Sequence, residues 1–258
     1  MIIELKSNER VLLYPFFSKR GNTFVHSYLQ GHMGRAWADS NTKPSYGLIQ
    51  VGDFCILSGK NYKDIDQVLS LLPDLTNRNN ILLMPGDKRI EEIIHKDYPK
   101  WDIIRRYAFE HKKAVFNIPY LKQMVAALDK EYKLYPMDEY WYSRVLKEEW
   151  SVDFVSNFES ATDYLNRGLG VVITRKDEIV SGASSYSIYN GGIEIQVDTK
   201  SAFRKKGLAY IASAALIIAC LERNIYPGWD AANEVSVHLA RKLGYSFSHT
   251  YNVFNINK

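Results

Sequence analysis

Hydrophobic and polar positions in the second half of the chain follow first a strand period and then a helix period. Three runs rich in β-branched residues are separated by short polar turns, the pattern of an antiparallel meander. A long apolar run follows, and its length is typical of a buried helix. The predicted elements are, in chain order, helices over 138–150 and 159–167, strands over 170–175, 179–188 and 193–197, a helix over 207–222, a strand over 225–229, a helix over 233–243 and a strand over 245–256.

The first half has a mixed pattern. Two apolar runs, 46–51 and 54–58, flank Gly52-Asp53, and such a pair around a two-residue glycine turn predicts a β-hairpin. The segment 31–44 is polar and predicts a loop, which carries Trp37 and Asp39. The remaining predicted elements are helices over 22–30, 64–72 (ended by Pro73), 88–96 and 119–128, a strand over 81–84 and an extended segment over 132–135.

This element order predicts an α+β fold in the second half, with a mixed, mostly antiparallel sheet and flanking helices. A smaller α/β domain precedes it. The length of 258 residues suits two domains. We place the boundary near residue 130, which gives domains over 1–130 and 131–258.

Composition agrees with a soluble globular protein, at 46% hydrophobic and 24% charged residues. The two cysteines, Cys55 and Cys220, lie far apart in apolar runs, which favours a reducing compartment and a cytoplasmic location. The apolar run from Leu208 to Leu221 is shorter than the ~20 residues of a membrane span. The net charge of +4 is scattered rather than concentrated, which argues against a nucleic-acid partner. No histidine has metal-ligand spacing, so we expect no metal.

One loop carries most of the chemical information. After the strand ending at Val197, the basic turn Arg204-Lys205-Lys206 leads into Gly207 and the long helix. Free amides at a helix start, together with the helix dipole, favour an anion. A solvated charge run before a buried helix is the alternative reading of the same residues. The loop lacks the spacing of a Walker motif.

The six residues Arg204-Lys205-Lys206-Gly207-Leu208-Ala209 resemble the Arg/Gln-x-x-Gly-x-Gly/Ala signature with which GNAT acetyltransferases bind the pyrophosphate of coenzyme A. The predicted element order from residue 131 onward is also similar to the GNAT order. Further segments resemble a two-domain GNAT subgroup that includes the zwittermicin A self-resistance acetyltransferases. These segments are 36–39, 52–54, 193–197, 227–233 and 239–245.

The resemblance implies an N-acetyltransferase that moves the acetyl group of acetyl-CoA to a primary amine, with a small molecule as the expected acceptor. It implies that Glu194 is the general base, although an exposed strand glutamate would fit the sequence equally well. Asn233 and Ser236 match coenzyme-contacting positions, and Asn233 also suits a helix N-cap. The coenzyme-binding residues that the resemblance implies are Ile195, Gln196, Val197, Arg204, Lys205, Lys206, Gly207, Leu208, Ala209, Asn233 and Ser236.

Four residues are candidates for acceptor binding: Trp37, Asp39, Trp229 and Asp230. Core packing is the alternative for Trp229, and a turn cap is the alternative for Asp230. Many GNAT enzymes place a tyrosine acid where this chain has Ala240. Either the thiolate leaves without a side-chain acid, or another group such as Ser236 or a water donates the proton.

Two other functions remain open from the sequence. The first is a coenzyme A-binding sensor without catalysis, which the alanine at position 240 favours. The second is an aminoacyl transferase of the Fem type, which also pairs two GNAT-like domains. We expect no membrane partner, and the sequence leaves the oligomeric state open.

Overall fold

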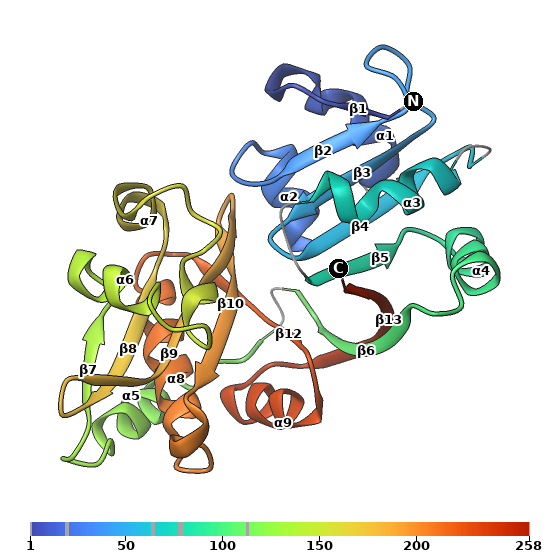
Figure 1. The fold of residues 1–258 in the computed structure, drawn as a ribbon. Coiled ribbons are helices and arrows are strands. Elements are labelled where there is room, and N and C mark those ends of the chain that lie inside the picture. Colours follow the sequence, from blue (N-terminus) through green and yellow to red (C-terminus); the bar gives the residue numbers. More distant parts are fainter. Residues whose placement is uncertain (1, 19–20, 63–64, 77–79, 112–113, 258) are drawn as a thin grey trace. The chain divides into compact units, whose positions relative to one another are not determined.

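The computed structural model describes residues 2–18, 21–62, 65–76, 80–111 and 114–257. The chain forms two compact units (Figure 1). Unit 1 comprises Met1–Arg106 and Thr250–Lys258, and unit 2 comprises Tyr107–His249. These units are defined by packing, and the expected domain boundary near residue 130 stays a prediction.

Unit 1 is built on a mixed sheet. Strands β1 to β4 pair antiparallel with their neighbours, β4 pairs parallel with β5, and residues 254–257 of β13 pair antiparallel with β5. The full strand order of this sheet is β1-β2-β3-β4-β5-β13-β6-β12. Its elements up to β6 are β1 (Ile3–Glu4), η1 (Ser7–Leu13), α1 (Tyr14–Phe17), α2 (Thr23–Leu29), β2 (Arg35–Ala38), β3 (Tyr46–Val51), β4 (Phe54–Gly59), α3 (Ile65–Leu75), β5 (Asn80–Pro85), α4 (Lys88–Asp97) and β6 (Asp102–Phe109).

The predicted hairpin in unit 1 is confirmed. Val51 pairs with Phe54 across the turn, and Gly52 has a φ of 58°, a conformation that glycine adopts without steric cost. Beneath the sheet, a cluster of buried side chains joins strands β3, β4 and β5 to helices α3 and α4. Phe254 and Ile256 of β13 belong to this cluster, so the end of the chain completes the core of unit 1.

Two predictions for unit 1 are wrong. Pro73 does not end the helix, because α3 continues to Leu75 with Pro73 inside it. A proline removes one backbone donor and bends the turn before it, and the last turn of a helix tolerates this more readily than its middle. Trp37 lies in strand β2 rather than in a loop, and its side chain is buried in the core cluster.

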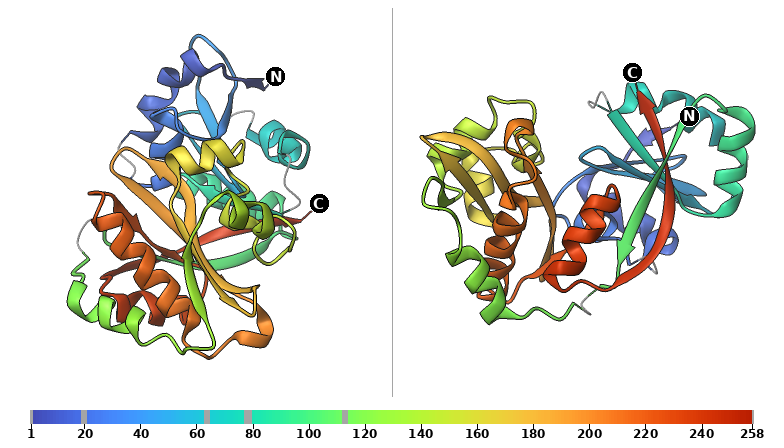
Figure 2. Two further views of the ribbon diagram at one scale, coloured as in Figure 1. Left: turned by 90° about the vertical axis from the view of Figure 1, so that its left-hand side faces the viewer. Right: turned by 90° about the horizontal axis from the view of Figure 1, so that it is seen from below.

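Unit 2 contains the predicted meander as strands β8, β9 and β10, and β10 continues into a parallel pairing with β11. Helices α5 and α8 pack on one face of this sheet, and η2 and α7 pack on the other (Figures 1 and 2). Its elements are α5 (Ile118–Ala126), β7 (Lys133–Pro136), α6 (Glu139–Val145), η2 (Val152–Phe154), α7 (Ala161–Arg167), β8 (Gly170–Arg175), β9 (Glu178–Tyr189), β10 (Gly192–Thr199), η3 (Ser201–Phe203), α8 (Leu208–Leu221), β11 (Tyr226–Gly228), β12 (Asp230–Ala231), α9 (Glu234–Leu243) and β13 (Phe247–Asn257).

The two halves of the chain follow a similar order of elements: an edge strand, short helices, a three-stranded meander, a helix, a strand parallel to the third meander strand, another helix and a final strand. The second half also contains β12, and its final strand, β13, pairs with β5 in the sheet of unit 1. The sequence predicts the fold class correctly, but it does not reveal that the first domain repeats the topology of the second. Among the described residues, no helix combines the length and apolar character that a bilayer crossing requires.

Candidate active site

The site is organised by the separation of strands β10 and β11. They pair in parallel only where residues 192–194 face residues 226–228. Beyond Gly228 the chain leaves β10, and Asp230 and Ala231 form strand β12, which pairs with β6. The edge of β10 that faces β11 is therefore unpaired from Ile195 onward, while its other edge stays paired with β9 to Thr199. Unpaired strand edges are available to a ligand that supplies its own amide groups.

The loop after β10 carries a group of free backbone donors. Gly207 is the N-cap of α8, with a φ of 78° and no capping side chain, and Lys205 also has a positive φ of 63°. Within the described part of the chain, none of the backbone amides of residues 205–210 donates a hydrogen bond. A Cβ added at Gly207 would meet nothing within 4 Å, so the approach to these amides is open. This arrangement can bind an anion such as a phosphate.

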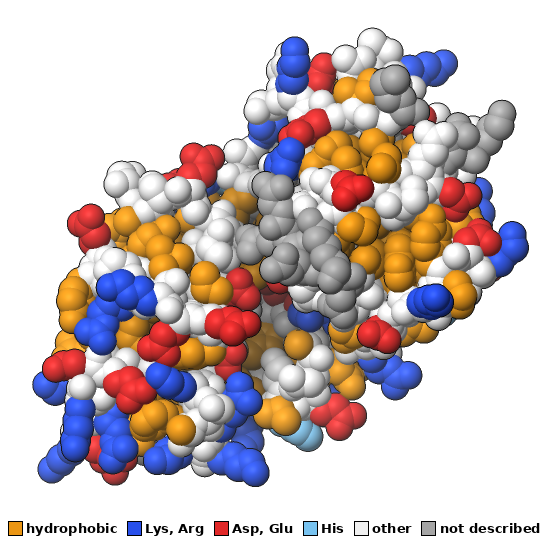
Figure 3. Space-filling view, in the orientation of Figure 1, with side chains coloured by type: hydrophobic (Ala, Val, Ile, Leu, Met, Phe, Trp, Pro, Cys, Tyr) orange, Lys and Arg blue, Asp and Glu red, His pale blue; other side chains and the backbone are white. Residues whose placement is uncertain are grey.

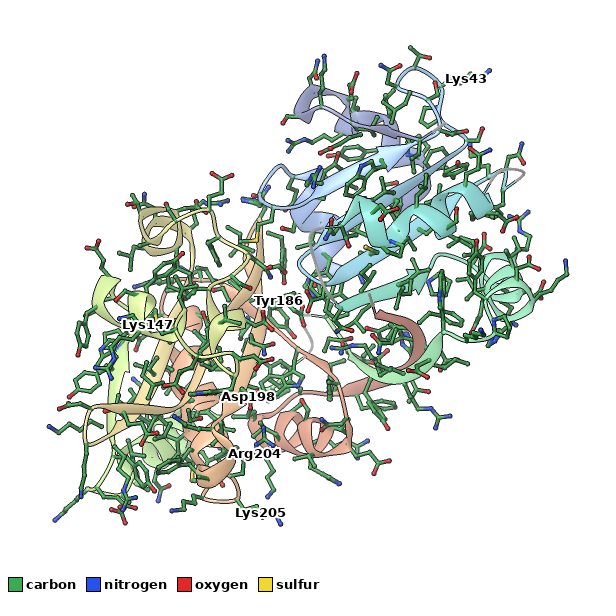
Figure 4. The ribbon with its side chains drawn as sticks, in the orientation of Figure 1. Lys43, Lys147, Tyr186, Asp198, Arg204 and Lys205 are labelled. Atoms are coloured by element: carbon green, nitrogen blue, oxygen red, sulfur yellow. The ribbon has the colours of Figure 1, made fainter. Side chains whose placement is uncertain are left out.

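Cationic side chains surround the loop. The guanidinium of Arg204 donates to the carbonyl of Thr199 at 3.1 Å and lies 3.6 Å from the Asp198 carboxylate, which keeps it beside the end of β10 (Figure 4). The ammonium of Lys206 lies 5.4 Å from the ring centroid of Phe203. In Figure 3, lysine and arginine side chains gather at the end of unit 2 where Figure 4 labels Arg204 and Lys205. The three predicted cations are thus all exposed at the start of α8.

Glu194 is the last residue of β10 that is paired with β11, and its side chain is 6% exposed. The reading of Glu194 as an exposed strand residue is therefore wrong. It shares one face of the sheet with Ser187 of β9 and Gly228 of β11, its paired residues. A Cβ at Gly228 would lie 2.8 Å from Glu194 Oε2, so the carboxyl group extends over that glycine. The register shifts by one residue directly after Glu194, where Tyr186 of β9 is the extra residue (Figure 4).

Aromatic side chains close this face on one side of Glu194. Tyr189 and Tyr226 are the residues paired with Gly192, two positions before Glu194. The ring of His111 lies 5.9 Å from that of Tyr189 and 5.0 Å from that of Tyr226. Burial, and then the nearby Glu194 carboxylate, raise the pKa of Tyr189 far above its usual value. The Tyr189 phenol is therefore protonated at neutral pH.

Helix α9 brings a second set of polar groups to the β11 side of the site. Asn233 Oδ1 accepts from the amide of Ser236 at 3.0 Å, so Asn233 is the N-cap. Trp229 Nε1 donates to Ser236 Oγ at 3.2 Å, and the Trp229 ring lies 5.5 Å from the ring of Tyr245. One helical turn after Ser236, Ala240 is fully buried. Ser236 therefore lies on the same side of α9 as Ala240, the position at which many GNAT enzymes have a tyrosine.

The structure brings most predicted site residues together and leaves two apart. The coenzyme loop, Glu194, Asn233, Ser236, Trp229 and Asp230 all belong to unit 2. Trp37 and Asp39 belong to unit 1. Asp39 Oδ1 accepts from the amides of Ser45 and Tyr46, which stabilises the turn before β3. A role for Trp37 or Asp39 in acceptor binding stays a prediction.

The sequence analysis missed the residues around Glu194, namely Ser187, Tyr189, Tyr226 and His111. Their neighbourhood depends on strand register, which a one-residue bulge changes. The Asn190-Gly191-Gly192 turn was the one signal in the sequence, because it sets the pairing of β9 with β10. Among the described residues there is no group of three metal-ligating side chains.

Comparison with known proteins extends over nearly the whole chain. The GNAT acetyltransferase family model matches residues 14–254. The chain is 25% identical over 247 residues to the uncharacterized N-acetyltransferase YdfB of Bacillus subtilis, covering 93% of this chain and 92% of that protein. The crystal structure of a GCN5-related N-acetyltransferase-like protein from Streptococcus suis has a TM-score of 0.87 at 34% identity, covering 96% of this chain and 98% of that one. A tandem GNAT protein from clavulanic acid biosynthesis shares the fold alone, with a TM-score of 0.57 at 9% identity over 100% of this chain and 98% of its own.

Proposed function

Because this chain belongs to the GNAT acetyltransferase family, we propose that it is a cytoplasmic enzyme that transfers the acetyl group of acetyl-CoA to the primary amine of a small molecule. The single observation that carries this proposal is the run of free amides at residues 205–210 next to the unpaired edge of β10. The resemblance to the zwittermicin A self-resistance subgroup favours a small polar amine as the acceptor.

The residues present fit coenzyme A. The amides from Lys205 to Tyr210 and the positive end of α8 would hold the pyrophosphate, and Arg204 and Lys206 would supply counter-charge. The edge of β10 from Ile195 to Val197, which includes Gln196, would pair with the amides of the pantetheine arm. When bound, acetyl-CoA supplies an activated acetyl thioester.

The protein then has to accept one proton and stabilise one developing charge. Glu194, buried beside the point where the strands separate, takes the proton from the acceptor ammonium, directly or through a water. The amide of Ile195 is at the start of the unpaired edge and would donate to the carbonyl oxygen as negative charge develops on it. The attacking amine and the carbonyl carbon are brought into contact by these two neighbouring residues.

Ser236 is our candidate donor to the departing thiolate. Its oxygen already accepts from Trp229 Nε1, so its own proton remains for another acceptor. Trp229 thus has a role in holding Ser236 rather than in packing alone. Ser236→Ala is expected to lower kcat in steady-state kinetics, because the proton donor to the thiolate is lost.

A pair of matched glycine variants tests the coenzyme site. Gly207 and Gly191 both have a φ of 78° and open space around a Cβ, but only Gly207 lies at the free amides. We expect Gly207→Asp to weaken acetyl-CoA binding by at least tenfold in titration calorimetry, because it places a negative charge where the pyrophosphate would bind. Gly191→Asp should bind as the native protein does.

Absence of acetyl-CoA binding to the native protein, or equal loss in both variants, would contradict the proposal. If the native protein binds acetyl-CoA, turnover is measured with spermidine, tyramine, glucosamine and lysine as acceptors. Coenzyme binding without turnover of any amine would favour a sensor instead of an enzyme.

A further inference from the structure

Two rows of residues cross strands β9, β10 and β11 on one face of unit 2. The first row is Tyr189, Gly192 and Tyr226, and the second is Ser187, Glu194 and Gly228. Paired residues share a face, and residues two apart along a strand do as well, so all six lie on the face of Glu194.

The glycines in these rows make space for polar groups. A Cβ at Gly192 would lie 2.1 Å from both Cζ and Oη of Tyr189, so the phenol lies directly over that glycine. The carboxyl group of Glu194 lies over Gly228 in the same way. The phenol and the carboxyl group therefore occupy neighbouring places on the sheet.

Ser187 adds a hydroxyl group that forms no hydrogen bond with another described residue. It is fully buried, and its Oγ has no hydrogen-bond partner among the described residues. A buried hydroxyl group without a hydrogen-bond partner lowers the stability of a protein. Ser187 is paired with Glu194, so their Cβ atoms are expected about 5 Å apart. A small polar group between the two side chains would give the Ser187 hydroxyl a hydrogen-bond partner.

We propose that Ser187, Tyr189 and Glu194 form a cradle for the primary ammonium group of the acceptor. This inference rests on the proposed function and names the residues that position its acceptor. Ser187 Oγ and the Glu194 carboxylate each accept one N–H, and the Tyr189 and Tyr226 rings close the adjoining side, where they also favour a cation. The cradle adjoins the end of the β10–β11 pairing, which puts the ammonium next to the amide of Ile195.

The test uses methylammonium as the simplest primary ammonium. The full chain is labelled with ¹³C at the glutamate carboxyl groups, and the Glu194 signal is the one that Glu194→Gln removes. Methylammonium should shift this signal saturably. Tetramethylammonium, which has the same charge but no N–H, should shift it less and only at higher concentration, because it can contact the tyrosine rings but cannot donate hydrogen bonds to Ser187 and Glu194.

Ser187→Ala should weaken methylammonium binding by at least tenfold, because a hydrogen bond to a charged group is lost. Ser213→Ala is the matched control, since Ser213 is also fully buried with an unpartnered Oγ but lies in α8. It should bind methylammonium as the native protein does. Ser187→Cys keeps a heavy atom at the γ position but makes it only a weak acceptor, and it replaces the alanine variant if that variant does not fold.

An unshifted Glu194 signal in the native protein, an equal response to tetramethylammonium, or native affinity in Ser187→Ala would each overturn the cradle. Methylammonium bound by a protein that binds no acetyl-CoA would contradict the proposed function and leave the cradle standing. Acetyl-CoA binding by a protein whose Glu194 signal does not respond to methylammonium would overturn the cradle and leave the proposed function standing.

Discussion

At the scale of single residues, glycines decide where the reactive groups lie. Gly192 is the first residue of β10 and Gly228 is the last residue of β11, and both take part in the pairing of these strands. A glycine in a paired strand weakens the sheet and often marks a close approach by another group. Here the approaching groups are the carboxyl of Glu194 and the phenol of Tyr189. The glycines are therefore part of the site, although they carry no chemistry.

Gly228→Ala is expected to displace Glu194. The added Cβ would lie 2.8 Å from Glu194 Oε2 and 2.8 Å from the Ile193 carbonyl oxygen. Overpacking of this kind lowers the free energy of unfolding by about 1–3 kcal/mol, and turnover should fall further than stability explains. Denaturant unfolding and steady-state kinetics measure both effects.

Gly21→Ala is the control, since a Cβ there meets nothing within 4 Å. It should leave the free energy of unfolding within about 1 kcal/mol of the native value. Native turnover in a well-folded Gly228→Ala protein would show that Glu194 need not lie where the structure has it.

Sequence reasoning identified Glu194 but not its neighbours. Strand alternation alone places Glu194 and Gln196 on the face opposite Ile193, Ile195 and Val197. Which residues of β9 and β11 stand beside Glu194 depends on register, and Tyr186 shifts that register by one residue. Ser187 was therefore indistinguishable from the other serines of β9.

At the scale of secondary-structure elements, two helix caps with the same geometry allow a structural role of an asparagine to be distinguished from a role in coenzyme binding. Asn233 caps α9 and Asn117 caps α5, each with a 3.0 Å bond from the third helical amide. Both alanine variants should lose about 1 kcal/mol of stability, as measured by chemical denaturation. Only Asn233→Ala should also raise the KM for acetyl-CoA, because α9 borders the coenzyme site.

Equal KM values in the two variants would mean that Asn233 is a cap and nothing more. A rise in KM for Asn117→Ala would instead show that the kinetic effect follows from lost stability.

Element prediction succeeded where the local signal is strong. The hairpin β3–β4, the meander and the helices around the site have turn residues or long apolar runs that mark them. It failed for β6, which has two adjacent arginines and no buried residue, so no alternation was visible. It failed for β2 because a four-residue strand between Gly34 and Asp39 resembles a loop. The prediction that Pro73 ends its helix is the third failure, because a helix tolerates proline near its end.

At the scale of the whole molecule, the two units share a topology but differ where the coenzyme loop should be. In unit 1 the connection after β4 contains Tyr62, which accepts from the Gly59 amide at 3.1 Å and contacts Asp87 Oδ2 at 2.7 Å. Burial and the hydrogen bond with Asp87 raise the pKa of Tyr62 to about 12. A carboxylate beside this connection repels a phosphate.

We therefore expect one acetyl-CoA per chain. Titration calorimetry should give a stoichiometry of one, and Gly207→Asp should remove that binding without uncovering a second site. A stoichiometry of two, or residual tight binding in Gly207→Asp, would mean that unit 1 also holds the coenzyme.

Strand β13 has a consequence for the order in which the protein folds. Unit 1 needs Phe254 and Ile256 for its core, and these residues are synthesised after the whole of unit 2. A ribosome-bound chain therefore exposes an unfilled hydrophobic surface and an open edge of β5 until residues 254–257 have been synthesised. The second unit can assemble early, whereas the first must wait for contacts of very long sequence separation, which form slowly. During synthesis this protein completes its first half last.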